Sequence, residues 1–204
     1  TLKMIRIFSN NAIPVGILRG EYSHLSHLNY DNRDAVFIAG LLAKNTFCTD
    51  VNFGGIGIND KGALALAEML RRTTSITSID LSGNDLIGDQ GWELLLTALN
   101  MNTTIKSIDL TGNNITDEAH DAFIKALETG ENCSLQYVKG LVLSDFAEIT
   151  LERNRAIQAA QDIRECKEEK LDLSSRDMVY IPELVQELEK NKTIAELDLR
   201  KNNF

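Results

Sequence analysis

Four aspartates at matching places in the chain are the residues best arranged for chemistry. Asp80, Asp109, Asp172 and Asp198 each stand between two aliphatic residues, in the sequences Ile-Asp-Leu or Leu-Asp-Leu. A row of carboxylates is the kind of group that binds Ca²⁺ or serves as a general acid or base. If the segments are neighbouring parallel strands about 4.8 Å apart, however, the row is an open stripe around which no pocket closes. The sequence therefore predicts a surface stripe and no calcium or catalytic site.

The remaining nucleophilic and metal-ligating residues are scattered. The three histidines, His24, His27 and His120, have no metal-ligand spacing and are predicted to lie at the surface or in loops. Cys48 falls at an apolar position of the repeat described below and is predicted to be a buried, inert thiol. A Cys–His nucleophile pair stays open, although nothing favours one. The glycine-rich residues 54–57 lack the Lys-Ser/Thr of a phosphate-binding loop. We expect no catalytic residue, no metal site and no cofactor.

The elements that hold these residues repeat along the chain. The pattern apolar-x-x-apolar-Asp-Leu-x-x-Asn occurs at 76–84, 105–113 and 194–202. Weaker copies centre on Ile5, Leu28, Val51, Val138 and Leu171. Successive copies lie between 23 and 33 residues apart, and the most regular intervals are 28, 29 and 30 residues. A motif that recurs at this spacing is typical of a solenoid, in which each repeat buries its apolar face against the next.

A helical pattern follows each of the regular strands. Asp60-x-Gly, Asp89-x-Gly and Asp117-x-Ala hold equivalent places, and the aspartates are interpreted as helix N-caps. Apolar residues four apart on one helical face come next, at Leu66/Leu70, Leu95/Leu99 and Phe123/Leu127. Each repeat is therefore predicted to be one strand followed by one helix.

The segments SIDLSGNDL and SIDLTGNNI, with their Asp-x-Gly/Ala helix openings, resemble the leucine-rich-repeat family. The 28- to 30-residue units resemble its ribonuclease-inhibitor-like branch. The resemblance implies an α/β fold, a right-handed horseshoe solenoid with parallel strands on the concave face and helices on the convex face. Asn84, Asn113 and Asn202 are expected to hydrogen-bond the backbone of adjacent turns as a ladder.

The repeats are predicted to be interrupted once. Residues 1–140 hold about six repeats, 141–170 an amphipathic helix and a polar connection, and 171–204 further repeats that look truncated. One continuous solenoid is favoured because no Gly/Ser/Pro linker divides the chain, and two sub-arrays meeting at an angle are the alternative. Both ends look unfinished, since a repeat array needs polar caps, so the chain is expected to be a fragment.

The resemblance and the strand geometry place a protein partner on the concave face. The predicted contact residues are Arg6, Phe8, Asn29, Asp31, Asn52, Asp80, Asp109, Tyr137, Lys139, Asp172, Asp198 and Arg200. For the two aromatic residues, Phe8 and Tyr137, packing between repeats and partner contact both stay open. Trp92 is expected to be partly exposed, either packing across Ala63 and His120 or, less favoured, anchoring a partner as a secondary site.

Charge narrows the class of partner. The net charge is −9 and the isoelectric point is near 4.9, which disfavours nucleic acid and suits a basic protein. No segment is apolar and long enough to predict a membrane span, and no small-molecule substrate is expected. The sequence favours a cytoplasmic, non-enzymatic interaction module. The resemblance adds a bacterial effector acting in the host cytosol, or an inhibitor of another effector; the alternative is the substrate-recognition part of a larger enzyme such as a ubiquitin ligase.

Overall fold

The computed structural model describes residues 4–6, 12–14, 16, 19–21, 23–25, 30–129, 134–179 and 181–202. The chain divides into two compact units, Thr1–Val142 and Leu143–Phe204, here called unit 1 and unit 2. The sequence favoured one continuous solenoid over two sub-arrays, and the boundaries 1–140, 141–170 and 171–204 stay predictions. Each unit is described by itself.

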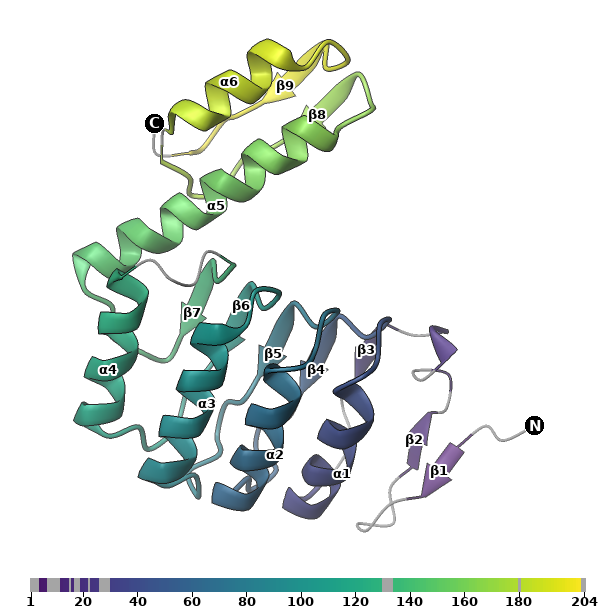
Figure 1. The fold of residues 1–204 in the computed structure, drawn as a ribbon, viewed down its shortest axis with the longest axis vertical. Coiled ribbons are helices and arrows are strands. Elements are labelled where there is room, and N and C mark those ends of the chain that lie inside the picture. Colours follow the sequence, from purple (N-terminus) through teal and green to yellow (C-terminus); the bar gives the residue numbers. More distant parts are fainter. Residues whose placement is uncertain are drawn as a thin grey trace. The chain divides into compact units, whose positions relative to one another are not determined.

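Unit 1 contains a five-stranded parallel sheet whose strands follow one another in chain order. The strands are β3 (His24–Leu25), β4 (Asp50–Asn52), β5 (Ser78–Asp80), β6 (Ser107–Asp109) and β7 (Tyr137–Lys139). The helices are α1 (Asn32–Leu42), α2 (Asp60–Leu70), α3 (Asp89–Met101) and α4 (Asp117–Glu128), and they lie side by side on one face of the sheet (Figure 1). One strand and one helix per repeat confirm the predicted α/β repeat solenoid.

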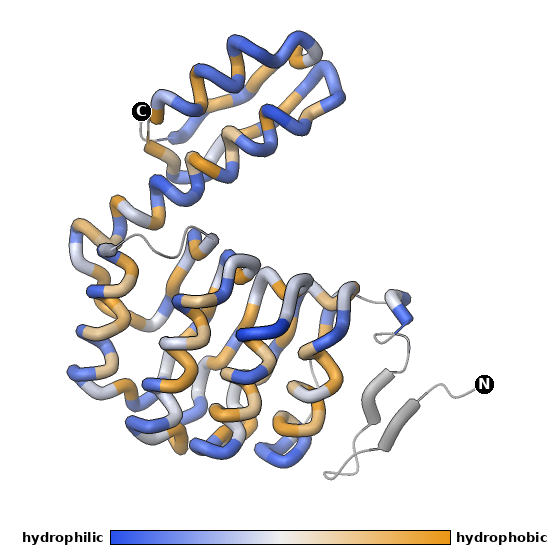
Figure 2. The backbone as a smooth tube through the Cα atoms, in the orientation of Figure 1, coloured by the Kyte–Doolittle hydropathy of each residue, from blue (hydrophilic) through white to orange (hydrophobic). Residues whose placement is uncertain are grey.

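The core lies between the strands and the helices. The central strand residues pair in register, Val51 with Ile79, Ile79 with Ile108 and Ile108 with Val138, so that one apolar residue of each repeat stacks on the next. The helix residues predicted to share one face are all buried, namely Leu66, Leu70, Leu95, Leu99, Phe123 and Leu127. Hydrophobic residues recur along each helix while hydrophilic residues gather in the turns (Figure 2). The periodicity of the sequence thus reports the packing between layers.

The helix starts differ from the prediction by one residue. Asn59 and Thr116 are the N-caps of α2 and α4, and Gly88 precedes α3 without a side-chain cap. The three aspartates interpreted as caps, Asp60, Asp89 and Asp117, are instead the first helical residues. Negative charge in the first turn is favoured by the helix dipole, so the same residue type suits either position.

The asparagine ladder is confirmed. The Asn84 amide donates to the carbonyls of Phe53 and Leu81, both at 2.9 Å, while its oxygen accepts the Ile58 N–H at 3.0 Å. Asn113 donates to the Leu81 and Leu110 carbonyls. Asn202 makes the equivalent bonds to the Leu173 and Leu199 carbonyls in unit 2.

A second polar ladder, which the sequence reading missed, closes the other end of the repeats. Asn102 follows α3, donates to the Leu70 carbonyl at 2.7 Å and accepts the Ile105 N–H at 2.6 Å. Asn45 and Asn191 accept backbone N–H groups in the same way, from Cys48 and Ile194. The signal was present, because Asn or Thr stands three residues before the first apolar strand residue in each of these repeats.

The N-terminal part of unit 1 corrects two register assignments. β1 (Met4–Arg6) pairs antiparallel with β2 (Ala12–Pro14), so the copy centred on Ile5 does not form the first strand of the parallel sheet. In β3, Leu25 pairs with Val51, so the central residue of that repeat is Leu25 and not Leu28. Both segments are apolar every two or three residues, and a short motif of this kind fits more than one register.

Unit 2 contains α5 (Asp145–Glu165), β8 (Lys170–Asp172), α6 (Pro182–Lys190) and β9 (Glu196–Asp198). β8 and β9 form a two-stranded parallel sheet in which Leu171 pairs with Leu197. A separate apolar core joins α5 to the strands and α6, with buried members Ala156, Ala159, Ala160, Ile163, Leu173, Met178, Ile181 and Leu184. The helix α5 lies within residues 141–170, where the sequence predicted an amphipathic helix and a polar connection.

Candidate protein-binding face

The outward side chains of the five parallel strands form one surface, here called the strand face. Because side chains alternate across a strand, the residues before and after each buried central residue both point away from the helices. The first row is His24, Asp50, Ser78, Ser107 and Tyr137, and the second is Asn52, Asp80, Asp109 and Lys139. All of them are partly or fully exposed.

The second row has a structural role as well as an exposed one. The side-chain oxygen of Asn52 accepts the Gly54 N–H at 2.8 Å, and one carboxylate oxygen of Asp80 accepts the Ser82 N–H at 2.9 Å. Asp109 accepts the Thr111 N–H at 3.0 Å. Each side chain therefore closes the turn at the end of its strand, which explains why both Asp and Asn occur there. Only the second oxygen, or the amide, is left to face outward.

Polar pairs link neighbouring strands across the strand face. His24 Nδ1 lies 2.9 Å from Asp50 Oδ2, and the Asn52 amide donates to Asp80 Oδ2 at 2.8 Å. Lys139 Nζ is 3.6 Å from Asp109 Oδ2. Burial disfavours the ionised form of Asp109, but the Thr111 hydrogen bonds and the Lys139 charge outweigh it and lower the pKa of this carboxyl. The stripe is thus a mixture of acids, amides and one ammonium.

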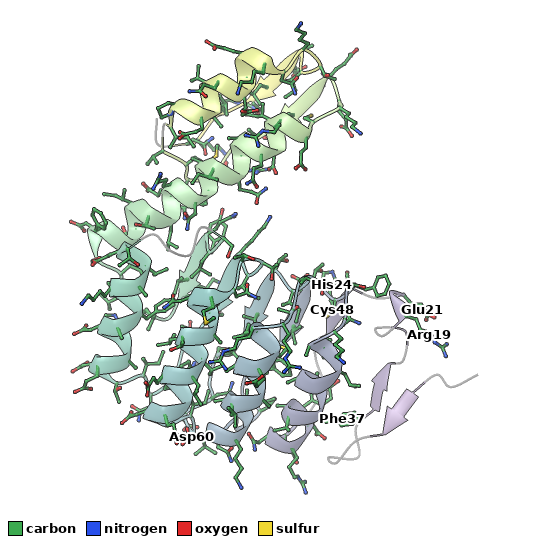
Figure 3. The ribbon with its side chains drawn as sticks, viewed as in Figure 1. Arg19, Glu21, His24, Phe37, Cys48 and Asp60 are labelled. Atoms are coloured by element: carbon green, nitrogen blue, oxygen red, sulfur yellow. The ribbon has the colours of Figure 1, made fainter. Side chains whose placement is uncertain are left out.

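One end of the strand face is aromatic and apolar. Tyr137 is 41% exposed, and Val142 in the loop beyond β7 is 82% exposed. At the other end lies His24, on the edge strand (Figure 3). A shallow hollow of about 160 Å³ lies between them over β3, β4 and β5, lined on its polar side by His24, Asp50, Asn52, Ser78 and Asp80. That volume is below the ~300–1,000 Å³ of ordinary small-molecule sites, so the surface suits a protein better than a metabolite.

The predicted contact residues fall in several places. Asn52, Asp80, Asp109, Tyr137 and Lys139 lie together on the strand face. Asp31 does not, because it caps α1 through the N–H groups of Arg33 and Asp34. Arg6 belongs to the antiparallel hairpin, while Phe8 and Asn29 lie outside the described residues.

The three predicted residues of unit 2 belong to its own two-stranded sheet. Asp172 and Asp198 pair in register on β8 and β9. Asp198 accepts from the Arg200 N–H and from its guanidinium, at 2.6 Å for Nη2, which lowers the pKa of Asp198 to about 2. The Arg200 guanidinium is therefore paired with Asp198 at the end of the same strand.

Sequence reasoning found only Tyr137 of the first row of the strand face. The other members, His24, Asp50, Ser78 and Ser107, also precede the central strand residues and were missed. The signal was available, because period-two alternation makes both flanking positions face the same way.

Trp92 corrects another expectation. Its side chain is fully buried, so the predicted partial exposure is wrong and the side chain cannot anchor a partner in this conformation. The adjoining Gly91 lets α3 approach α2 closely enough to cover the ring, since a Cβ at Gly91 would lie 3.1 Å from that of Ala63. The indole N–H has no hydrogen-bond partner among the described residues.

The other candidate groups behave as ordinary structural residues. Cys48 is buried as predicted, and burial raises the pKa of its thiol to about 11. His120 contacts Asp121 and the Val142 carbonyl, and the Asp121 hydrogen bond raises its pKa. Cys133 and His27 lie outside the described residues. In the described part of the chain no three acidic, histidine or cysteine side chains gather as a metal site, and no helix there is long and apolar enough to cross a membrane.

Parallel strands in chain order, one helix per strand and an asparagine ladder together define a leucine-rich-repeat solenoid. A family model described as Leucine Rich repeat matches residues 73–100 and 102–122, which are the repeats at the centre of the strand face. A search of curated proteins finds no match.

Two solved structures share the fold. The actin-binding site 2 of leiomodin-1 is 22% identical, with a TM-score of 0.61 over 74% of this chain and 91% of that chain. The tropomodulin C-terminal domain of Caenorhabditis elegans is 15% identical, with a TM-score of 0.61 over 73% of this chain and 95% of that chain. At these identities the likeness concerns the fold alone.

Proposed function

We propose that the protein is a non-enzymatic interaction module that binds a protein partner through the strand face of unit 1. The observation that carries the proposal is the exposure of two full rows of polar side chains with Tyr137 at one end, uncovered by any described element. Interfaces of this composition, polar with an aromatic anchor, are typical of protein recognition. The likeness to a structure named for actin binding supports testing actin among the first partners.

The charges of the strand face favour a partner with basic groups at its centre. Asp50, Asp80 and Asp109 carry negative charge on adjacent strands, whereas Lys139 stands at the far end. A complementary surface would place lysine or arginine over β4 to β6 and an apolar patch against Tyr137. Asp172, Asp198 and Arg200 of unit 2 stay proposed contacts of the same kind.

The finer assignments rest on family resemblance alone. We propose membership in the ribonuclease-inhibitor-like branch, cytoplasmic location and, as one biological setting, an effector that an intracellular bacterium delivers into host cytosol. Substrate recognition for an enzyme such as a ubiquitin ligase is the alternative, and it requires a catalytic domain in the same protein. The complete gene sequence separates the two, because only the second predicts an appended domain with a nucleophilic cysteine.

The test is capture of partners from cell lysate, followed by calorimetry with each purified partner and with actin. The informative variant is Asp50→Lys, because among the described residues the polar partners of the Asp50 side chain are His24 and Thr49, and Asp50 does not close a strand-end turn. A second variant, Asp109→Asn, removes one charge and keeps the oxygen that accepts the Thr111 N–H, as Asn52 does naturally at its own turn. We expect both to weaken binding about tenfold, as loss of interfacial charge pairs does.

The matched control is Asp85→Lys, which makes the same charge change at an exposed loop residue outside the strand face. Binding by this control should equal that of the parent within about twofold. Equal binding by the parent and both strand-face variants, with circular dichroism unchanged, would show that the partner uses another surface.

A further inference from the structure

The helical side of unit 1 contains a groove that the strand face does not involve. It runs between α3 and α4 and encloses about 470 Å³, compared with about 250 Å³ for the groove between α1 and α2. Its walls are lined by Asp89, Glu93, Leu96, Thr97, Asn100, Thr116, Glu118, Ala119, Ala122 and Phe123. From Asp89 to Asn100 the groove follows about 17 Å of α3, at 1.5 Å per helical residue.

The groove lies where α4 lacks a glycine that the two preceding helices have in their first turn. Glycine is the third residue of α2 and α3, and a Cβ there would clash with Asn32 Oδ1 at Gly62 and lie 2.6 Å from Asp60 Oδ1 at Gly91. Those same oxygens accept the N–H groups of Asn59 and Gly88, which ties each helix start to the next. The equivalent residue of α4 is Ala119, which carries a methyl group where α2 and α3 have none and which lines the groove.

The loss of this contact leaves the equivalent carboxylate, Asp89, without its interhelix bond. Asn32 and Asp60 each accept a backbone N–H of the following repeat, whereas Asp89 accepts none among the described residues. Glu93 and Glu118 also line the groove, and neither is paired with a basic side chain in the part of the chain that is described. First-turn acids such as Asp89 and Glu118 are favoured by the helix dipole, but Glu93 lies beyond the first turn.

The floor of the groove is apolar, and one hydrogen-bond acceptor at its end has no donor among the described residues. Ala119 and Ala122 are accessible, and Leu96 and Phe123 close the space beneath them. At the far end the Oδ1 atom of Asn100 is buried and has no hydrogen-bond partner among the described residues.

We propose that this groove binds a basic segment of a protein partner, which inserts arginine or lysine side chains between α3 and α4. An arginine combines an apolar stem, which would lie over Ala119 and Ala122, with five N–H donors. These donors match the carboxylates of Asp89, Glu93 and Glu118, which have no basic partner among the described residues, and no basic side chain lines the groove to compete. The site is separate from the strand face, so the two proposals can fail independently.

The test uses the whole chain and a labelled amphipathic helical peptide of Arg, Leu and Ala, about 15 residues long to span the groove at 1.5 Å per residue. Fluorescence anisotropy measures its affinity, and amide chemical shifts of the labelled protein report where it binds. We expect shifts concentrated in α3 and α4. Replacing arginine by glutamate in the peptide should abolish binding, because like charges would then face each other.

Two groove variants test the chemistry separately. Glu93→Gln with Glu118→Gln removes charge at exposed positions and should weaken binding about two- to fivefold for each charge. Ala122→Leu adds bulk at an exposed floor position and should block the groove while preserving the fold. The matched control is Asp85→Asn, a charge removal at an exposed residue that does not line the groove.

Several results would overturn the proposal. Equal loss of affinity in Asp85→Asn would mean non-specific attraction to an acidic protein, and unchanged affinity in Ala122→Leu would place the peptide elsewhere. Shifts confined to the strand face, or no binding by the parent, would likewise exclude the groove. If light scattering shows a homodimer and Ala122→Leu converts it to a monomer, the groove is occupied by a second copy of the chain and the proposal is wrong.

Discussion

At the scale of single residues, the polar positions of the repeat divide into those that hold the backbone and those that also face outward. Asn52, Asp80 and Asp109 do both, since one oxygen closes the strand-end turn and the rest of the group is accessible. Because Asn and Asp serve the turn equally, the turn alone does not require a charge at this row. The second oxygens of Asp80 and Asp109 also contact neighbouring strands, at Asn52 and Lys139.

Asn84 belongs to the first kind, and its replacement should be costly. It is fully buried and its amide serves the Ile58 N–H and the Phe53 and Leu81 carbonyls. Asn84→Ala would leave the Ile58 N–H and the Phe53 carbonyl without this partner inside the solenoid, each worth about 1–3 kcal/mol, while the Leu81 carbonyl keeps its bond from Asn113. We expect a loss of at least about 2 kcal/mol in the free energy of unfolding, measured as a lower urea midpoint with an unchanged slope.

The control for this change is Asn114→Ala, an exposed asparagine in the turn that follows β6. Its effect should stay within about 0.5 kcal/mol, as for most surface substitutions. If the two variants unfold at the same urea concentration, the ladder does not stabilise the repeats in the way proposed.

At the scale of elements, the distance between neighbouring helices depends on one residue in each first turn. Gly62 and Gly91 allow close packing, and the interhelix bonds from Asn32 and Asp60 follow from it. Ala119 ends the series. The larger groove, between α3 and α4, lies where the glycine is replaced, and the smaller one lies between α1 and α2.

Gly91→Ala should therefore destabilise the protein although alanine is the better helix former. The new methyl group would lie 2.6 Å from Asp60 Oδ1 and 2.8 Å from Ile87 Cγ2, and relief requires α3 to move from α2. Overpacking of this kind costs about 1–3 kcal/mol. Thermal or urea unfolding measures the change.

Gly40→Ala is the matched control, since Gly40 lies within α1 and a Cβ there would have no atom within 4 Å. This variant should gain about 0.5–1 kcal/mol from helix propensity. A gain in both variants would contradict the role given to Gly91.

The sequence predicted the elements better than it predicted their exposed surfaces. The strand and helix periods are repeated in the central units, so the α/β solenoid, the Asn84 ladder and the buried Cys48 followed directly. Leu25 and Leu28 could not be distinguished, because both fit a three-residue motif and only pairing with Val51 decides between them. Trp92 was misjudged for a different reason, since its burial depends on how closely α2 and α3 pack, a tertiary distance that no single repeat encodes.

At the scale of the whole molecule, the net charge of −9 acts on every basic ligand, wherever that ligand binds. The long-range field raises association rates, whereas close contacts determine how long a complex survives. The helices α3 and α4, whose residues line the groove, lie on one side of the sheet of unit 1 (Figure 1), and the side chains of the strand face point away from the helices. A charge on one of these two surfaces therefore affects a ligand on the other only through the field.

This separation predicts different kinetics for two charge reversals of equal size. Asp50→Lys on the strand face and Glu93→Lys in the groove each replace a carboxylate by an ammonium, so each moves the net charge from −9 to −7. For the arginine peptide, both should slow association, and Glu93→Lys more than Asp50→Lys, because the potential at the groove falls with distance from the changed charge. Only Glu93→Lys should also speed dissociation, by about tenfold or more, since it alone places a cation beside the bound guanidinium groups.

Stopped-flow anisotropy at low and at physiological salt measures both rates. Raising the salt should reduce the association rates of all variants toward a common value, because screening beyond about 8 Å removes the field. The dissociation rate of Glu93→Lys should remain faster than that of the others, since a contact at the groove is screened much less. Faster dissociation in Asp50→Lys would instead show that the peptide contacts both surfaces, and this would contradict their independence.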